Sequence, residues 1–453
     1  MSKILLFVLP LPSHLNIVAM LADSLQQRGH EVVFAGMKDA QAKIESLGFP
    51  FVPLFAKRLP AGLMQEWLTG DVIRDTWRKK LDYLLGERRK IIDHEHFVEE
   101  LINGGYQEVV DAVREIAPDL IVVDVGLHTY WPLMTRMTGV RCIYISPMLP
   151  LSQHDIIPPL NSLLPPAGDF AGRVRVRAAW EWNFIKRWLV ARVMNLAGIP
   201  DPIANFHRLA QATGCPDAAF NSRSLMFPEL DFPLMTTTPA EFEFPQALGR
   251  PNIHYVGAIL KLDRVEPAFP WELLDPAKKL IFCSLGSVAY SHFFFQNVVD
   301  AVSKEPSWQL VVNIGPKIKP EMLQRVPQGT ILVNGAPQLA ILRKAHVMIN
   351  HGGINSVREC AYLGVPQLVF PLFFDQNGSA ARVAYHGLGM SAQLAKAGPD
   401  QIREWIAAIL SDSAMQERCH EMSKAFQRQA TGAPAAKVVE QFLPQANSRT
   451  TVV

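Results

Sequence analysis

Residues 335–376 read GAPQLAILRKAHVMINHGGINSVRECAYLGVPQLVFPLFFDQ. Short apolar runs in and just before this stretch predict buried strands at Thr330–Val333, His346–Asn350 and Gln367–Phe370, separated by short helices. Strands that alternate with helices in this way predict right-handed βαβ units and a parallel sheet covered on both faces. The stretch therefore predicts an α/β fold.

Polar residues follow each of these three strands. Gln338 follows the first, His351–Gly353 follow the second, and Asp375-Gln376 follow the third. In a parallel sheet the loops after the strands gather at one edge, where ligands bind. We therefore expect the three polar clusters to converge on one crevice.

The Gly352-Gly353 pair permits close backbone approach at the start of a helix beginning near Ile354. The free N–H groups and partial positive charge of that helix end suit a pyrophosphate. Asn355, Ser356 and Glu359 share the ligand end of this helix, and a carboxylate there can accept both hydroxyls of a ribose. Taken alone, the junction is equally consistent with a tight turn, and Glu359 with a solvated helix charge. The convergence of all the clusters favours a nucleotide site.

Strand and helix patterns also alternate elsewhere in the chain. The helix pattern Ile17–Arg28 stops at Gly29, and a strand pattern leads into Gly286-Ser287, which could supply a further phosphate contact. Two Rossmann-like domains are expected, joined between Phe244 and Trp271, with two helices from Pro399 to Phe442. The further strands expected are Ile4–Leu9, Glu31–Ala35, Phe49–Leu54, Leu120–Asp124, Arg141–Ile145, Leu280–Ser284 and Trp308–Ile314. Insertions at 60–106 and 150–245 interrupt the first domain.

Composition excludes several classes of protein. The net charge of +2 and the absence of a nucleic-acid-binding motif argue against a nucleic-acid partner. Five scattered cysteines without metal-ligand spacing indicate a reduced, cytoplasmic protein. The apolar start is broken early by prolines and polar residues, so a first β-strand explains it better than a signal peptide, and no apolar run is long enough to predict a transmembrane helix.

A candidate base lies in the loop after the first strand, LPLPSHLN, where His14 stands just before a helix. Asp124 closes a strand that by the usual strand order lies beside the first one. A neutral imidazole oriented by a carboxylate can take a proton from a hydroxyl group as that group attacks. From position alone, a histidine near a helix start with no chemical role is an equal alternative.

The chain resembles the family of nucleotide-sugar-dependent glycosyltransferases with two facing Rossmann domains, the GT-B architecture. The resemblance is most specific from Gly335 to about Val383, is supported by SLGSVA near Ser284 and by residues 4–36, and is weaker over most of the chain outside the insertions. It implies an active site in the cleft between an acceptor-binding domain, 1–250, and a donor-binding domain, 251–425. It also implies a C-terminal helix and tail, 426–453, that pack back on the first domain.

The family pattern assigns a role to each part of the motif. His14 would be the general base and Asp124 its partner, in an inverting, metal-independent transfer of a hexose, with glucose favoured. The diphosphate would be held by His351, Gly352 and Gly353, with Asn355 and Ser356 nearby. The expected donor site is completed by Ser287, Ala336, Gln338 beside the nucleoside, Glu359 on the ribose, and Asp375 and Gln376 on the sugar hydroxyls.

Four positions depart from that pattern. Gly335 stands where the family commonly has a tryptophan that stacks on uracil, so the donor is UDP-linked by preference with TDP as the alternative. Ser379 replaces a common asparagine, and Ser13 and Ile17 replace a glycine and a proline beside the predicted base. No cofactor is expected beyond the nucleotide sugar.

Three other functions remain open on the sequence alone. These are an epimerase or hydrolase on the same scaffold, a non-catalytic nucleotide-sugar binding protein, and a dehydrogenase, the last disfavoured because the first βα loop lacks Gly-x-Gly-x-x-Gly. The acceptor is expected to be small, lipophilic and hydroxylated, and to meet the two insertions.

Two further segments invite a functional interpretation. Residues 93–96, Asp-His-Glu-His, resemble a metal site, but residues two apart on a helix point to different faces and a solvated surface fits better. A basic helix with Trp180, Trp182 and Trp188 is more typical of packing on the first domain, with a weak membrane-surface contact as the alternative. We expect a monomer or a weak dimer.

Overall fold

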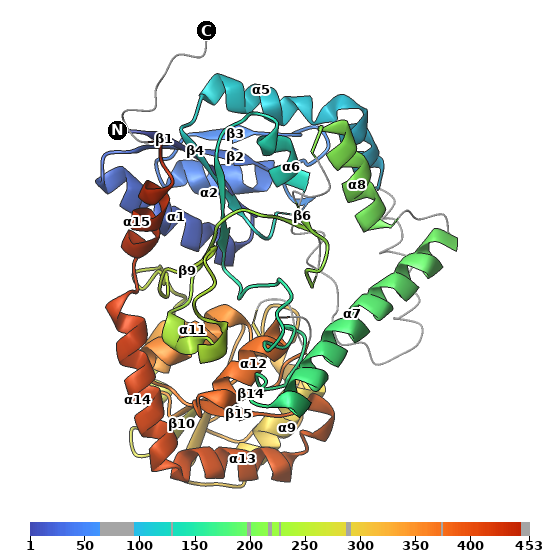
Figure 1. The fold of residues 1–453 in the computed structure, drawn as a ribbon. Helices are drawn as coiled ribbons and strands as arrows, with labels where there is room; N and C mark the ends of the chain where they lie inside the picture. The colour runs from blue at the N-terminus through green and yellow to red at the C-terminus, as the bar shows by residue number, and fades with distance from the viewer. Residues whose placement is uncertain are drawn as a thin grey trace.

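The computed structural model describes residues 1–63, 95–127, 130–196, 201–215, 220–225, 228–286, 291–372 and 375–444. They form two α/β domains, one above the other in Figure 1, each built on a parallel sheet. The predicted fold class is confirmed. Within the described residues, no helix is both long enough and apolar enough to cross a bilayer.

The N-terminal sheet has the strand order β3-β2-β1-β4-β5-β8-β9, and every neighbouring pair in it is parallel. Its centre is apolar on both faces because helices cover both, as the fully buried run Ile4–Phe7 illustrates. The strands are β1 (Lys3–Phe7), β2 (Glu31–Gly36), β3 (Phe51–Pro53), β4 (Leu120–Asp124), β5 (Cys142–Ser146), β8 (Leu234–Thr236) and β9 (Ile253–Tyr255). The sequence analysis missed β8 and β9, and β9 extends this sheet past the boundary expected at residue 250.

Where the sequence of the N-terminal half carries a helix stop signal, the helix ends close to the predicted residue. The first helix ends just before Gly29 as expected but already begins at Pro12, so His14 lies in its first turn rather than before it. A short antiparallel hairpin pairs β6 (Phe220–Asn221) with β7 (Glu229–Leu230). The helices are α1 (Pro12–Gln27), α2 (Gln41–Ser46), α5 (Gln107–Ile116), α6 (Tyr130–Arg136), α7 (Phe170–Leu196) and α8 (Pro202–Ala212).

The C-terminal sheet has the order β12-β11-β10-β13-β14-β15 and is also parallel throughout. Every strand predicted here is present, and β15 was missed. The strands are β10 (Lys279–Ser284), β11 (Trp308–Asn313), β12 (Ile331–Val333), β13 (Val347–Asn350), β14 (Gln367–Val369) and β15 (Gly389–Ser391).

Three helices follow Pro399 where two were predicted, because the chain turns at Asp412 and again after Arg428. The helices of this half are α9 (His292–Val302), α10 (Gln338–Leu342), α11 (Ile354–Leu363), α12 (Gln376–Tyr385), α13 (Pro399–Ser411), α14 (Ser413–Arg428) and α15 (Ala433–Gln441). Single-turn or irregular helical segments lie at Lys38–Ala40, Leu101–Gly105, Ala240–Phe242, Pro245–Ala247, Trp271–Leu273, Pro320–Met322 and Leu394–Lys396.

The chain crosses from the first domain to the second after β9 and returns after α14, and the segments around Leu160 and Phe242 also reach the core of the second domain. After the return, Ala435, Ala436 and Val439 of α15 join the core under β1 and α1. This is the return of the C-terminal helix that the sequence analysis expected, and α15 lies beside α1 in Figure 1.

The two passages touch each other. Gly257, on the way out, has a φ of +79° and lies so close to the returning chain that a Cβ there would be 2.3 Å from the carbonyl oxygen of Gln429. Three residues further, the N–H of Leu260 donates to the carbonyl of Ala430 at 3.4 Å. A side chain at position 257 would therefore separate the passages.

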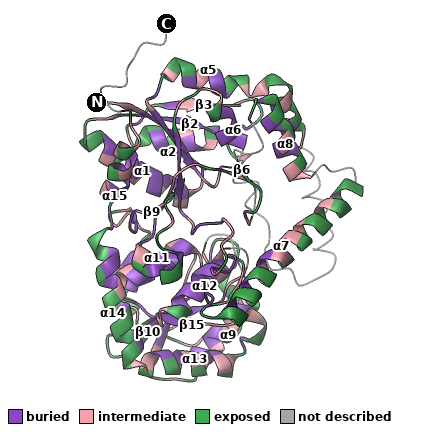
Figure 2. Cartoon of the chain, viewed as in Figure 1, coloured by how far each residue is buried: buried purple, intermediate pink, exposed green. Residues whose placement is uncertain are grey.

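Buried contacts also join the domains away from these passages. Arg382 of α12 and Glu243 are both fully buried and form an ion pair, with the guanidinium Nε 2.8 Å from Oε1. Figure 2 shows buried positions along the helices and strands of both domains.

Candidate active site

The predicted catalytic pair is brought together at the edge of the N-terminal sheet. Because β1 and β4 are parallel neighbours, with Phe7 opposite Val123, the loop after β1 and the last residue of β4 meet at the same edge. There the Nδ1 atom of His14 lies 2.8 Å from Oδ2 of Asp124. Both residues are buried, Asp124 completely.

Backbone N–H groups hold the carboxylate of Asp124 in place. Leu9 donates to Oδ2 at 3.2 Å and Gly126 donates to Oδ1 at 2.8 Å. With Oδ2 also accepting from Nδ1, a neutral His14 carries its proton on Nδ1 and leaves Nε2 as a hydrogen-bond acceptor. This tautomer is the one that can take a proton from a hydroxyl group.

The glycine pair before α11 is required by close packing. Gly352 has a φ of +81°, and a Cβ there would lie 2.8 Å from the carbonyl oxygen of Gln376. Its N–H donates to Oδ1 of the buried Asn350 at 2.7 Å, an anchoring contact that the sequence analysis did not single out. Gly353 caps α11 without a side-chain hydrogen bond, so the first N–H groups of the helix have no side-chain cap.

His351 is enclosed between two glycines. A Cβ on Gly286 would be 2.6 Å from its Cε1 atom, and a Cβ on Gly353 would be 2.5 Å from its Nε2 atom. Burial lowers the pKa of His351 to about 4, and its Nδ1 is buried with no hydrogen-bond partner among the described residues. Its imidazole is therefore neutral at pH 7.

The residues expected around the nucleoside form one hydrogen-bonded group. The side-chain amide of Gln338 donates to Glu359 at 2.8 Å and to the hydroxyl of Ser356 at 3.3 Å. Ala336 is partly buried just before α10, in the loop that leads to Gln338. Ser287 lies outside the described residues.

An arginine that the sequence analysis missed binds this group from the segment between β9 and β10. Both terminal nitrogens of Arg264 contact the Glu359 carboxylate, Nη2 at 3.1 Å from Oε2, and Glu359 is only 4% exposed. No local motif surrounds Arg264, so only the three-dimensional structure brings it to the site.

A second unpredicted arginine, Arg358, is fully buried inside the motif helix. Its Nη1 donates to Oδ1 of Asn355 at 3.3 Å, and its Nη2 donates to the carbonyl of Pro147 from the other domain. Within the described part of the chain it forms an ion pair with no carboxylate, and burial lowers its pKa to about 9. The sequence could have indicated its burial, because Arg358 stands four residues after Ile354 and therefore on the same face of the helix.

Asp375 connects the two halves of the site. Burial raises its pKa to about 6, against the opposing influence of its own amide and of the nearby His14 and Arg358. The neighbouring Gln376 is buried, and its Oε1 accepts from the N–H of Leu372 at 2.9 Å. The residue expected at the sugar therefore lies close to the expected base.

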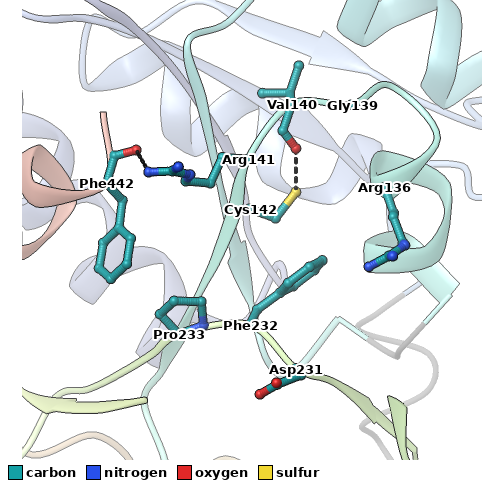
Figure 3. A pocket seen from close by; sticks show the side chains of 9 residues that line it. All are labelled: Arg136, Gly139, Val140, Arg141, Cys142, Asp231, Phe232, Pro233 and Phe442. Atoms are coloured by element: carbon teal, nitrogen blue, oxygen red, sulfur yellow. Dashed lines mark hydrogen bonds between the residues drawn. The ribbon is translucent and has the colours of Figure 1, made fainter. Parts of the chain in front are cut away.

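Two hollows lie on the N-terminal domain. The one in Figure 3, of about 630 Å³, is lined by Arg136, Arg141, Phe232 and Phe442 among others and lies at the start of β5, away from the predicted residues. A second hollow has a volume of about 480 Å³. It is lined by Val125, the residue after Asp124, and by Phe220, Leu230 and neighbouring residues of the second insertion.

Of the metal-like segment, Glu95 and His96 are described. Glu95 accepts a hydrogen bond from the side chain of Asn205, while His96 is exposed. Among the described residues, no three or more His, Cys, Asp or Glu side chains are grouped so that they could hold a metal ion.

Comparison with known proteins finds similarity to glycosyltransferases. Residues 298–442 match the C-terminal domain of the erythromycin biosynthesis protein CIII-like family. The chain is 25% identical to zeaxanthin glucosyltransferase of Pantoea ananas over 96% of this chain and 94% of that protein. The chain is therefore similar to glycosyltransferases of the UDP-glycosyltransferase-like type.

Other glycosyltransferases match over shorter lengths. The chain is 31% identical to oleandomycin glycosyltransferase of Streptomyces antibioticus over 43% of this chain and 45% of that protein, so it spans about half of this relative.

Solved structures show the same fold. The glycosyltransferase of kitacinnamycin superposes with a TM-score of 0.69 at 21% identity, covering 98% of this chain and 99% of that one. Spinosyn rhamnosyltransferase SpnG complexed with thymidine diphosphate superposes with a TM-score of 0.59 at 19% identity, covering 97% and 100% of the two chains. The GT-B architecture predicted from the sequence is confirmed.

Proposed function

We propose that this protein transfers a hexose from a nucleoside diphosphate sugar to a hydroxyl group of a small lipophilic acceptor. The observation that carries the proposal is the pair His14–Asp124, joined at 2.8 Å and close to Asp375 of the donor domain. A base, an expected sugar-binding carboxylate and an open helix N-terminus thus belong to one cleft.

In the proposed reaction, Nε2 of His14 accepts the proton of the acceptor hydroxyl as its oxygen attacks the anomeric carbon. Asp124 stabilises the imidazolium that forms, and the bond from the anomeric carbon to the diphosphate breaks on the opposite side, which inverts the configuration. The N-terminus of α11 and the Arg358 cation stabilise the negative charge on the leaving diphosphate. Because these groups supply the positive charge, the proposal includes no metal or cofactor.

The donor assignment rests on the group around Glu359. We assign the ribose hydroxyls to the buried carboxylate of Glu359, which also accepts from Gln338 and Arg264. His351, Gly352 and Gly353 adjoin the helix end where the diphosphate would lie. We favour UDP-glucose. TDP-linked sugars are the alternative, supported by the thymidine diphosphate complex of SpnG and by the missing ring at Gly335.

The hollow beside Val125 is the proposed acceptor site. Val125, the residue after Asp124, lines it, and its lining is mixed, with the apolar Phe220 and Leu230 beside polar residues such as Glu229 and Arg250, which suits an acceptor that is lipophilic but hydroxylated. A cytoplasmic location belongs to the same proposal, because Cys142, Cys283, Cys360 and Cys419 are buried free thiols.

The experiment that tests the proposal compares wild type with His14→Ala, using UDP-glucose and TDP-glucose with a panel of lipophilic alcohols and phenols. Transfer should fall by about 10²–10⁴-fold in the variant. The affinity for UDP, measured by calorimetry, should be nearly unchanged. A variant that keeps wild-type turnover would remove His14 from the mechanism.

The same assay separates the competing functions. Release of free sugar from donor alone, at the rate seen with acceptor present, would indicate a hydrolase, and conversion of the donor sugar would indicate an epimerase. Binding of UDP without any turnover by the wild type would favour a non-catalytic nucleotide-sugar binding protein.

A further inference from the structure

The carboxylates of Glu266 and Glu359 fix the orientation of the planar guanidinium of Arg264. Its Nη1 and Nη2 contact Glu359, and its Nε and Nη2 contact Oε1 of Glu266 at 3.4 and 3.2 Å. These four hydrogen bonds use four of the five N–H groups of a guanidinium. The side chain nevertheless stays 29% exposed, so the planar face is the main surface it can offer a ligand.

Both carboxylates are themselves anchored to the donor domain. Glu266 accepts from the N–H groups of Leu339 and Ala340 at 2.9 and 3.1 Å, at the start of α10. Glu359 accepts from Gln338. Although Arg264 belongs to the segment between the domains, its guanidinium is therefore fixed to the donor domain.

The segment after Arg264 runs beside Gly335. A Cβ on Gly335 would contact only the Cγ atom of Pro267, at 3.6 Å, and the intervening Val265 is completely exposed. A planar cation, an open glycine and an exposed apolar side chain thus lie together beside the ribose-binding carboxylate. Guanidinium groups stack on aromatic rings, including nucleobases.

We propose that the face of Arg264 is the stacking surface for the pyrimidine base of the donor. This inference rests on the proposed function, since it names the part of the donor that lies next to Glu359. The bidentate pairs fix the plane of the guanidinium, and Gly335 leaves the room that the base needs.

The test uses calorimetry on the full chain with UDP, TDP and inorganic pyrophosphate as probes. Arg264→Ala should weaken UDP and TDP about tenfold and leave pyrophosphate unchanged. Arg264→Lys keeps the charge but not the plane and should behave like Arg264→Ala. Adding Gly335→Trp to Arg264→Ala should restore the affinity for both nucleotides, because the indole supplies a stacking ring at a position where a Cβ would meet only Pro267 Cγ at 3.6 Å.

Two results would overturn the inference. One is full wild-type affinity for UDP and TDP in Arg264→Ala, and the other is an equal loss for pyrophosphate, which would indicate a charge effect. Either result leaves the proposed function standing if wild type transfers sugar. A wild type that binds neither nucleotide would overturn both, and circular dichroism of each variant checks that it folds.

A different observation concerns α7, which lies along the outside of the molecule in Figure 1. One side of this helix packs on the body through Val176, Trp180 and Phe184, and the Nε1 atom of Trp180 donates to the carbonyl of Ile157 at 2.9 Å. The opposite side carries large apolar side chains that nothing in the described structure covers. We call them the outer stripe: Phe170, Val174, Trp182, Ile185, Trp188, Leu189, Val193 and Leu196.

The outer stripe runs along the helix from Phe170 to Leu196. At 100° per residue its members fall within an arc of about 140° opposite the packed side, and the charged residues Arg175, Glu181 and Arg192 fall within the same arc. Trp182 and Trp188 are 54% and 56% exposed, and Phe170 is 82% exposed. An apolar strip of this length, about 40 Å over 27 residues, is far more than monomeric proteins usually expose.

The charges of α7 indicate what covers the stripe. The helix carries six cations and one acid, Glu181, and Arg223 already pairs with that acid. Lys186 lies 5.1 Å above the ring of Trp182, and Arg192 lies 5.2 Å from the ring centre of Trp188. Tryptophan beside lysine and arginine, next to an apolar strip, is typical of helices that lie in the interface of an anionic bilayer.

We infer that α7 binds the surface of anionic phospholipid membranes. The apolar outer stripe would enter the boundary between headgroups and acyl chains, and Arg175, Lys186 and Arg192 would contact the lipid phosphates. This binding does not depend on transferase activity. It would bring the proposed acceptor site close to lipophilic molecules dissolved in the bilayer.

Co-sedimentation with vesicles tests the inference. Wild type should sediment with phosphatidylcholine–phosphatidylglycerol vesicles, less with pure phosphatidylcholine, and less as salt rises. A variant with Trp182→Ser, Trp188→Ser and Val193→Ser should stay in the supernatant. The matched control, Leu273→Ser, changes an equally exposed apolar residue of the other domain and should bind like wild type.

Absence of wild-type binding, or equal binding by the triple variant, would overturn the inference. So would a lipid-free dimer in sedimentation velocity that the triple variant abolishes, because the outer stripe would then bind a second copy of the chain.

Discussion

Gly126 and His14 lie so close together that a Cβ on Gly126 would be 2.8 Å from the Cε1 atom of the imidazole. The same Cβ would be 2.9 Å from Leu9 and 3.2 Å from Oδ1 of Asp124. Gly126 also donates its N–H to that oxygen at 2.8 Å. Gly126 thus orients the Asp124 carboxylate through its hydrogen bond, and because it has no side chain it leaves room for the imidazole of His14.

Gly126→Ala should therefore displace the His14 ring while leaving the donor domain intact. We expect sugar transfer to fall by about 100-fold, since general-base catalysis contributes a factor of this size and depends on position. Affinity for UDP should stay within twofold of wild type on calorimetry, roughly the scatter of such measurements. Transfer at the wild-type rate would show that the ring position is not critical.

Asp375 should control the pH dependence of the sugar site. Its pKa is raised to about 6 by burial, so the carboxylate that would hold the sugar loses its charge below that pH. We expect kcat/KM to fall as pH drops through 6, and Asp375→Asn to show a low rate at every pH. A flat wild-type profile between pH 5 and 8 would contradict this role.

The same group predicts a trend in stability. Because its folded-state pKa lies above the ordinary 3.8, the folded protein binds more protons than the unfolded chain between about pH 4 and 6. Its contribution to stability is therefore lost as pH rises through this range. Asp375→Asn should melt at a higher temperature than wild type at pH 7.5, and the difference should shrink at pH 4.5. A lower melting temperature at pH 7.5 would disagree.

His351 should respond to an anion. Burial lowers its pKa to about 4, so it is neutral in the free protein, and a bound diphosphate should raise that pKa. UDP affinity should then increase several-fold from pH 7.5 to pH 5.5, since each unit of linked pKa shift is worth up to tenfold. His351→Gln cannot be charged and should lose most of this increase, which separates His351 from protonation of Asp375. Identical pH dependence in the two proteins would exclude the effect.

Replacing Arg358 should separate stability from function. Among the described residues its buried guanidinium has no ion-pair partner and its Nε atom no hydrogen-bond partner. Arg358→Met removes that desolvation cost and keeps the apolar stem, so the melting temperature should be equal or higher. Turnover should fall at least tenfold, because a charge near the leaving group is lost. Unchanged turnover in a well-folded variant would remove Arg358 from the proposed mechanism.

The sequence predicted the parts of the fold that carry a periodic apolar signal. Leu120–Asp124 was predicted with the correct first and last residue, because four consecutive apolar residues and a final aspartate, with turn signals on both sides, favour a buried strand. The strands Leu234–Thr236, Ile253–Tyr255 and Gly389–Ser391 were missed because three residues hold no period and their pairing comes entirely from neighbours in the sheet.

The site shows the same division. His14, Asp124 and the His351–Gly353 loop were predicted because each follows a recognisable strand. Arg264 was not, since it lies 95 residues from Glu359 in a segment without periodicity. Asn350 was read as the end of a strand, and its hydrogen bond to Gly352 depends on a backbone conformation that the sequence does not specify.

The contact between Gly257 and Gln429 has a mechanical consequence. The segment that leaves the first domain at Gly257 and the segment that returns at Gln429 contact each other here. A relative motion of the domains would therefore bend both segments at the same place. Opening and closing by such bending leaves the contact intact. Twisting one domain against the other would have to shear it, together with the hydrogen bond from Leu260 to Ala430. The contact therefore favours bending over twisting as a relative motion of the two domains.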